Sequence, residues 1–419
     1  MKTKRRNFIK LSLGAAAVTL PTINLSAASA TIVIIGGGFG GASCATAIKR
    51  AMPSTKVILI EKNKFFHTCP FSNLVLSGER DIKQIRFGYD TLKEKYGIEV
   101  IHLDAIDVDA DSKVVVLSDK SKIKYDKLVM SPGIDFRFDA LEGFTSADTE
   151  KIPHAYKAGE QTLLLRKQLE GMKDGGVFAL VPPTNPYRCP PGPYERVSVI
   201  ANYFKKNKPK SKILIFDPKE KFSKQALFQE GWDSLYGKMI TWYSGSVGGA
   251  LESIDVDAKT LITDFGEETA DVINYIPPQK AGAIAHKAGL TDSSGWCPVN
   301  ADFTSKQAKD IYVIGDASIS GKMPKSGFSA NNQGKYVALD IVSKLKGGAT
   351  PVFKLNNVCY SFVGDEYAVS VSAVYETKDN SIISVTSGTS PLKAPKDTRI
   401  LEAHHAVSWY NAITNEMFG

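Results

Sequence analysis

The apolar positions near the start of the chain follow a strand, helix and strand pattern. Residues 31–35 form a β-branched apolar run that is typical of a buried parallel strand, and residues 56–60 form a second one. Between them, residues 42–51 are mostly small and predict a helix that packs closely on the sheet. The order of these three segments predicts a βαβ unit.

A second unit of the same kind follows later in the chain. Residues 177–181 and 213–216 predict strands, and residues 197–205 predict the helix between them. Two such units predict an α/β fold with two doubly wound, Rossmann-like domains.

Beyond residue 350 the pattern changes. Alternating apolar positions from residue 358 onward predict antiparallel strands, and Ala406, Tyr410, Ile413 and Met417 recur at the spacing of an amphipathic helix. This region is expected to form a small α+β C-terminal domain. The predicted organisation is a signal peptide at 1–30, a first nucleotide-binding domain at 31–150 and 271–350, a second Rossmann-like domain at 151–270, and the C-terminal domain at 351–419.

The first thirty residues have the composition of an export signal. Arg5 and Arg6 precede an apolar run at residues 11–20, as in twin-arginine signals, and Ala28-Ser29-Ala30 offers a cleavage site. The apolar run is too short for a membrane span, which takes about 20 residues. We therefore expect export to the periplasm, and no stretch after the signal predicts a transmembrane segment.

The positive charge of the chain is concentrated in that signal. The whole chain carries a net charge of +8, but the first thirty residues hold five basic side chains and no acid, which leaves +3 for the remainder. Such a balance argues against a nucleic-acid-binding protein. The six histidines show no spacing typical of metal ligands, so no metal site is expected.

The turn after the first predicted strand is rich in glycine. Gly36, Gly38 and Gly41 have the spacing that lets the chain turn tightly and lets a pyrophosphate approach a helix N-terminus. Glu61 ends the next strand, twenty residues beyond Gly41, where a carboxylate can bind an adenosine ribose. Strand, glycines, helix, strand and acid together predict a dinucleotide site.

The corresponding turn of the second unit is built differently. Residues 182–193 contain several prolines and Cys189 instead of a glycine fingerprint. Proline lacks the N–H that would bind a phosphate, and its φ is fixed. This loop argues against NAD(P)H as the electron source and favours a small substrate that reacts through sulfur.

Several motifs resemble those of a known family. The chain is similar throughout to the flavoprotein subunit of flavocytochrome c sulfide dehydrogenase, a relative of sulfide:quinone oxidoreductase in the disulfide reductase superfamily. The matching segments are Gly-Gly-Gly-Phe-Gly-Gly, Thr-Cys-Pro-Phe-Ser-Asn, Cys-Pro-Pro-Gly-Pro-Tyr-Glu-Arg, Tyr-Val-Ile-Gly-Asp and Trp-Tyr-Asn-Ala-Ile-Thr, together with the twin-arginine signal.

The resemblance implies roles for individual residues. The first domain would bind FAD, with Cys69 as an 8α-cysteinyl attachment point and Asp316 on the ribityl chain. Cys189 and Cys359 would form a redox disulfide over the flavin, and Glu195 would act as an acid or base beside it. From the residues alone, a permanent structural disulfide and a free thiol at position 69 remain alternatives.

The resemblance also implies an activity. It predicts a periplasmic FAD-dependent sulfide dehydrogenase that oxidises hydrogen sulfide to sulfur or polysulfide and passes electrons to a c-type cytochrome subunit, in a heterodimer. The chain has no Cys-x-x-Cys-His motif, so the haem is expected on the partner. The alternatives are a sulfide:quinone oxidoreductase and a non-catalytic exported electron-transfer flavoprotein.

Two further cysteines and two arginines can be explained by structural roles as well as by functional ones. Cys44 and Cys297 are expected to pack in the core. Arg188 or Arg196 could favour a thiolate or attract hydrosulfide, but a solvated or carboxylate-paired side chain is an equally good interpretation of each.

Overall fold

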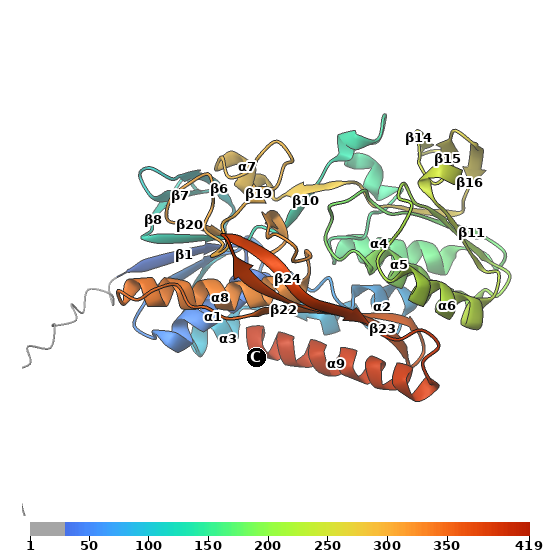
Figure 1. Cartoon of the computed structure of the whole chain (residues 1–419). Helices are drawn as coiled ribbons and strands as arrows, with labels where there is room; N and C mark the ends of the chain where they lie inside the picture. Colours follow the sequence, from blue (N-terminus) through green and yellow to red (C-terminus); the bar gives the residue numbers. More distant parts are fainter. Residues whose placement is uncertain (1–29) are drawn as a thin grey trace, which may run out of the picture.

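The computed structural model describes residues 30–419, and the predicted signal at residues 1–29 lies outside the described residues. Two parallel sheets with their helices form the two ends of the molecule, the first in blue and orange and the second in green (Figure 1). The first sheet has the order β20-β9-β1-β2-β5, and every pair in it is parallel. Its strands are β1 (Thr31–Ile35), β2 (Lys56–Ile60), β5 (Glu99–Ile101), β9 (Lys127–Met130) and β20 (Ile311–Val313).

The second sheet repeats the parallel arrangement. Its order is β13-β12-β11-β17, again with parallel pairs only, and it confirms the predicted α/β class with two Rossmann-like units. Its strands are β11 (Val177–Val181), β12 (Lys212–Phe216), β13 (Ile240–Tyr243) and β17 (Val272–Tyr275). The helices of this region are α4 (Glu160–Gly171), α5 (Gly192–Asn207) and α6 (Gln225–Tyr236).

Two helices from distant parts of the chain pack together beside the first sheet. They are α1 (Phe39–Ala51) and α8 (Gly327–Leu345), which lie against each other (Figure 1). The approach is close because Gly334 faces the Gly40 carbonyl oxygen, which would lie 2.4 Å from a Cβ at position 334. Cys44 on α1 is fully buried here, and so is Cys297 elsewhere in the core, as predicted for packing residues.

Helix α5 is longer than predicted. We expected it to begin at residue 197, but it begins at Gly192. Pro193 is tolerated because the first turn of a helix does not use its N–H groups for intrahelical hydrogen bonds. The earlier start places Glu195 in the first turn, directly after the loop that carries Cys189.

The chain leaves the second sheet later than the predicted boundary at residue 270. Strand β17 pairs with β11, so residues up to Tyr275 belong to the second sheet. The connections between the two sheets are β10 (Ile134–Phe136) and β18 (Gln279–Ala281), which pair antiparallel. The predicted boundary at residue 270 is therefore too early, because β17 pairs with β11 in the second sheet.

The C-terminal region spans both units. It consists of the antiparallel strands β22 (Leu355–Gly364), β23 (Tyr367–Lys378) and β24 (Ser381–Thr389), followed by helix α9 (Lys396–Phe418). In Figure 1 the strands cross the middle of the molecule and α9, in red, runs below them. All four apolar positions predicted for the inner face of α9 are buried.

The remaining elements are short. They include helices α2 (Ser72–Ser77), α3 (Asp90–Glu94) and α7 (Ala283–Lys287). They also include four small sheets, formed by β3 (Phe66–His67) and β4 (Arg86–Phe87), by β6 (Ala105–Asp109), β7 (Val114–Leu117) and β8 (Lys122–Lys124), by β14 (Ser253–Asp255), β15 (Thr260–Thr263) and β16 (Gly266–Thr269), and by β19 (Cys297–Pro298) and β21 (Ser318–Ile319). Across residues 30–419, no helix combines the length and apolar character required to cross a membrane.

Candidate functional site

Four of the predicted site residues line one cavity. Cys69 precedes α2, Cys189 precedes α5, Glu195 lies in α5, and Cys359 lies on β22. The rest of the lining is largely aromatic and includes Phe71, Tyr156, Phe328, Tyr360, Phe362 and Trp409. The fold therefore brings together three cysteines and a carboxyl group from distant segments in an apolar setting.

The thiol groups of Cys189 and Cys359 lie close enough to shift each other's pKa. Both are free thiols in the structure, so the predicted disulfide between them stays a prediction. Cys189 has a φ of 52°, a left-handed conformation that is costly for a residue with a Cβ. Such a conformation is held by its surroundings, and here Cys189 donates its N–H to the Lys325 carbonyl at 2.7 Å.

Tyr156 also holds the loop around Cys189. Its hydroxyl group donates to the Cys189 carbonyl at 2.8 Å and lies 3.1 Å from the carbonyl oxygen of Arg188. The N–H of Gly192 donates to the same Cys189 carbonyl, also at 2.8 Å. Tyr156 was not among the predicted site residues, because no local motif marks it.

The two thiols have opposite pKa shifts. The pKa of Cys359 is lowered, first by the neighbouring Cys189 thiol and then by the nearby Lys224 ammonium group, against the effect of burial. The pKa of Cys189 is raised well above its usual value by the neighbouring Cys359 thiol and by burial. The Lys224 ammonium group therefore favours a thiolate at Cys359.

Glu195 is held by two donors beside the cysteine pair. Its Oε1 accepts from the Phe362 N–H at 3.0 Å, and its Oε2 accepts from the Asn73 amide at 2.8 Å. Burial raises its pKa, and these hydrogen bonds oppose the shift. A raised pKa suits a carboxyl group that takes up and releases protons near neutral pH.

Asn73 is a site residue that the sequence analysis left unassigned. Its amide also donates to the Gly192 carbonyl at 3.1 Å, and its Oδ1 accepts from Arg196 at 3.1 Å. Its only signal in the sequence was its place in the Thr-Cys-Pro-Phe-Ser-Asn segment. Asn73 therefore orients the carboxyl group of Glu195.

The two arginines have mainly structural contacts. Arg196 is 2% exposed and donates to Asn73, Asn274 and the carbonyls of residues 154 and 155. Arg188 lies 3.8 Å from Asp316 in an ion pair, which agrees with the carboxylate-paired interpretation. Burial lowers the pKa of Arg196, while neighbouring groups that become anionic favour its charge.

The glycine-rich turn lies at the carboxyl end of β1, away from the cysteines. Gly36 has a φ of 96°, and a Cβ on Gly41 would lie 1.8 Å from the Gly36 carbonyl oxygen, so both positions require glycine. Helix α1 begins after Gly38 without a side-chain cap or an acidic residue in its first turn. Its N–H groups and dipole are therefore suited to a phosphate.

Glu61 lies beside this turn at the end of β2. Its Oε2 accepts from the Gly37 N–H at 3.0 Å, and its Oε1 accepts from the backbone and side chain of Asn63 at 2.9 Å. The carboxyl group is half-buried, so a ribose hydroxyl can reach it. This arrangement fits the adenosine end of a dinucleotide.

Asp316 lies near the cysteines, after β20. Its Oδ1, the Nε of Arg188 and the Nε2 of Gln279 are buried without a hydrogen-bond partner among residues 30–419. Unpaired buried polar atoms are costly, so three of them in one neighbourhood indicate a polar ligand. They fit a ribityl chain, and with the glycine turn they form a site for FAD.

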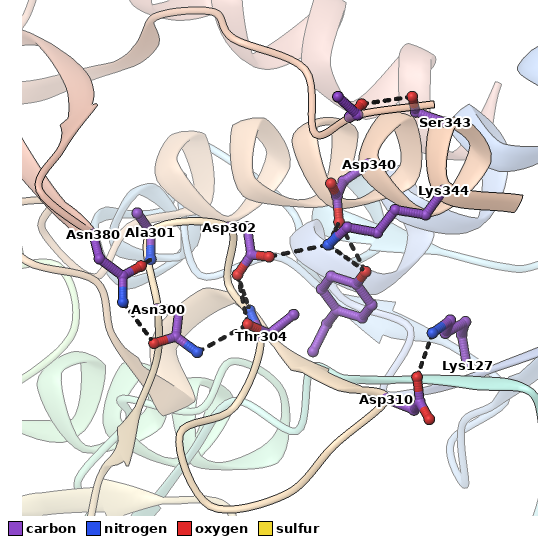
Figure 2. Close-up of polar contacts among 12 residues, drawn as sticks. Lys127, Asn300, Ala301, Asp302, Thr304, Asp310, Asp340, Ser343, Lys344 and Asn380 are labelled. Carbon is purple, nitrogen blue, oxygen red and sulfur yellow. Dashed lines mark hydrogen bonds and ion pairs between the residues drawn. The ribbon is translucent and has the colours of Figure 1, made fainter. Parts of the chain in front are cut away.

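A larger hollow elsewhere lacks these features. It measures about 410 Å³ and is lined by residues around Asn300, Asp302 and Asn380. Figure 2 shows that these polar groups bind one another: Asn380 donates to Asn300 at 3.0 Å, and Lys344 lies between Asp302 and Asp340. The network ties the β23–β24 turn to α8 and contains none of the predicted site residues.

Comparison with protein families gives matches along most of the chain. Residues 162–277 match the profile "Sulfide dehydrogenase [flavocytochrome c] flavoprotein chain, central", and residues 351–418 match "Flavocytochrome c sulphide dehydrogenase, flavin-binding". Residues 30–169 match "Pyridine nucleotide-disulphide oxidoreductase". The second and third of these matches cover the segments that contain Cys359 and Cys69.

Individual relatives agree with these profiles. The mitochondrial sulfide:quinone oxidoreductase of Mus musculus is 23% identical over 68% of this chain and 65% of its own length, so the match spans less than two thirds of that enzyme. A sulfide dehydrogenase flavoprotein chain of Chlorobaculum thiosulfatiphilum is 52% identical over 44 residues, which are 10% of this chain and 92% of that sequence.

A solved structure shares the fold. The sulfide:quinone oxidoreductase of Aquifex aeolicus superimposes with a TM-score of 0.74 over 92% of both chains, at 19% identity. Family profiles, relatives and fold agree with the FAD site and the cysteine-lined cavity. The profile matches and relatives therefore support a flavoprotein of the flavocytochrome c sulfide dehydrogenase and sulfide:quinone oxidoreductase type, similar to the disulfide reductases.

Proposed function

We propose that this chain is the flavoprotein subunit of a periplasmic sulfide dehydrogenase. It oxidises hydrogen sulfide through a Cys189–Cys359 disulfide and FAD, and it passes the electrons to a c-type cytochrome subunit. The observation that carries this proposal is that Cys189 and Cys359 line one cavity together with Glu195 and Cys69.

The first step uses the disulfide form of the pair. Hydrosulfide attacks one sulfur, a new S–S bond forms, and the bond between the cysteines breaks to release a thiolate. Removal of the sulfur by a second nucleophile leaves two electrons on the protein. The overall change, HS⁻ to S⁰ with loss of H⁺ and two electrons, requires a proton acceptor, and Glu195 is placed for that role.

FAD supplies the remaining redox chemistry when it is bound, because a flavin accepts two electrons from sulfur and releases them singly. The glycine turn and Glu61 would hold its adenosine end, and Asp316 with Arg188 and Gln279 would hold its ribityl chain. Cys69 lines the same cavity as the reactive pair, and this position supports covalent attachment of the flavin through its thiol.

The proposed export and the proposed partner are supported by the sequence and its similarities. The twin-arginine signal supports periplasmic location, since this route carries folded proteins with their cofactors. The similarity to flavocytochrome c flavoprotein chains supports a cytochrome partner. A quinone acceptor is the second candidate, favoured by the fold shared with the Aquifex aeolicus enzyme.

The central test is an anaerobic titration of the purified holoprotein with sulfide, monitored by flavin absorbance. Wild type should bleach, and Cys359→Ser should not, because no disulfide can form. Cys297→Ala is the matched control, since this buried cysteine does not line the cavity, and it should bleach as wild type does. Bleaching in Cys359→Ser would remove the disulfide from the mechanism.

The acceptor and the flavin link have separate tests. The protein should co-purify from periplasm with a c-type cytochrome that sulfide reduces in the mixture, whereas a haem-free preparation that reduces quinone would assign the second candidate. After acid precipitation, yellow colour should stay on wild type and be lost from Cys69→Ser. Colour lost from wild type would overturn the covalent link.

A further inference from the structure

Lys224 is a buried lysine with an unusual set of partners. It lies just before α6, is 9% exposed, and has a left-handed backbone with a φ of 60°. Its ammonium group donates to the Cys359 carbonyl at 3.1 Å, the Ser361 hydroxyl at 2.8 Å and the Val369 carbonyl at 3.3 Å. Within residues 30–419, no carboxylate forms an ion pair with it.

Burying such a group is costly unless an anion or several dipoles compensate it. The three oxygens satisfy its hydrogen bonds but leave its charge without a formal counterion. The nearest part of β22 carries Cys359. Negative charge on Cys359, and then on Glu195, would favour the charged form of Lys224. The strand segment 359–362 thus has a cation on one side and Glu195, bound to the Phe362 N–H, on the other.

Resting on the proposed function, we propose that Lys224 is a positioning residue that selects Cys359 as the sulfur that leaves as thiolate when hydrosulfide opens the disulfide. Hydrosulfide then bonds to Cys189. The S–S bond breaks, its electron pair stays on Cys359, and the hydrosulfide proton remains on the new persulfide. Charge is conserved, since one anion enters and one thiolate forms beside a cation already in place.

Besides Lys224, only Cys189 lowers the pKa of Cys359, and the remaining charged groups do not favour its thiolate. From α5, Glu195 opposes a thiolate, whereas Cys189 acts from the preceding loop. From α9, Glu402 acts on Lys224, but it already accepts from Ser370 and pairs with Arg399 at 3.4 Å. Lys224 is the one cation that favours the Cys359 thiolate in this set.

The test measures the thiols directly. The purified protein is reduced with a phosphine, and each cysteine is alkylated with iodoacetamide across a pH series and quantified by peptide mass spectrometry. In wild type, Cys359 should react with a lower pH midpoint than Cys189. If Cys189 reacts at the lower pH, the assignment is overturned, and no variant is needed to reach that result.

The variants then assign the effect to Lys224. Lys224→Met should raise the Cys359 midpoint by about one to two pH units, the size typical of losing a nearby charge, and Lys224→Arg should restore it. Lys208→Met is the matched control: Lys208 is 8% exposed, also donates to backbone carbonyls, and lies at the far end of α5. It should leave the Cys359 midpoint unchanged.

An unchanged midpoint in folded Lys224→Met, or an equal shift in Lys208→Met, would overturn the proposal. Because alkylation does not involve sulfide, this failure is distinct from failure of the sulfide titration. Circular dichroism establishes that each variant is folded before its midpoint is compared.

Discussion

The two βαβ units share a topology, but only the first has a turn and a helix N-terminus suited to binding a nucleotide phosphate. In the first, the turn after β1 is glycine, and α1 begins without a cap or an acid. In the second, the turn after β11 carries prolines and Cys189, and Glu195 stands in the first turn of α5. A carboxylate occupies the end of the second helix where its dipole would favour a phosphate.

The acids that end the second strand of each unit differ as well. Glu61 is half-buried and accepts from the glycine turn. Asp217 is fully buried and accepts from Tyr194 at 2.6 Å and Trp242 at 3.1 Å, and it pairs with Lys219 at 2.6 Å. The second unit therefore uses its acid for contacts within the protein, and its turn carries a cysteine in place of a glycine fingerprint.

The largest expected effect is a loss of folding stability when the buried acid of the second unit, Asp217, is removed. Asp217→Ala should lower the free energy of unfolding by about 3–5 kcal/mol, because it leaves Lys219 buried and unpaired. Denaturant unfolding measures the change. Asp257→Ala removes an exposed carboxylate paired with Lys151 and should change stability by less than about 0.5 kcal/mol. Equal losses in both variants would contradict the comparison.

The glycine turn gives the next largest effect. Gly41→Val should weaken FAD binding by about 100-fold, because its side chain would collide with the Gly36 carbonyl and separate α1 from the turn. Flavin content per protein measures this. Gly171→Val adds the same side chain where nothing lies within 4 Å and should retain full flavin.

Glu61 provides a smaller effect on the cofactor alone. In a Cys69→Ser background, where binding is not covalent, Glu61→Gln should weaken FAD about 10-fold, because a charged hydrogen bond becomes neutral. Fluorescence titration measures the affinity, and FMN, which lacks adenosine, should bind both forms equally. A loss that is the same for FMN would place Glu61 outside the adenosine site.

The smallest effect concerns Glu195 and pH. Burial raises its pKa in the folded protein, so the stability associated with its protonated form is present below the ordinary carboxyl pKa and is lost as pH rises through the folded value. The stability of wild type relative to Glu195→Gln should therefore fall as pH increases. Denaturant unfolding at several pH values measures the trend, and the opposite slope would contradict a raised pKa.

Local sequence was enough for the regular elements. Strands β1, β2 and β11 match their predicted ranges, because buried parallel strands are short β-branched runs whose pattern does not depend on distant residues. The glycine fingerprint was predictable for the same reason, since its backbone conformations are intrinsic to glycine. The start of α5 was missed because prolines before a helix also predict a loop.

The cavity itself was decided by tertiary structure. Cys189 and Cys359 are 170 residues apart, and nothing in their spacing determines that they meet. Tyr156, Gln279 and Lys224 lie in segments without a diagnostic pattern, and the Thr-Cys-Pro-Phe-Ser-Asn segment gives no role to Asn73. The fold nevertheless brings all four residues close to the proposed site residues. Sequence alone predicted candidate site residues and a backbone that can bind a dinucleotide, because these depend on residue type and local conformation. Only the packing of distant segments decided which charges and donors surround each sulfur, because electrostatic interactions act through space rather than along the chain.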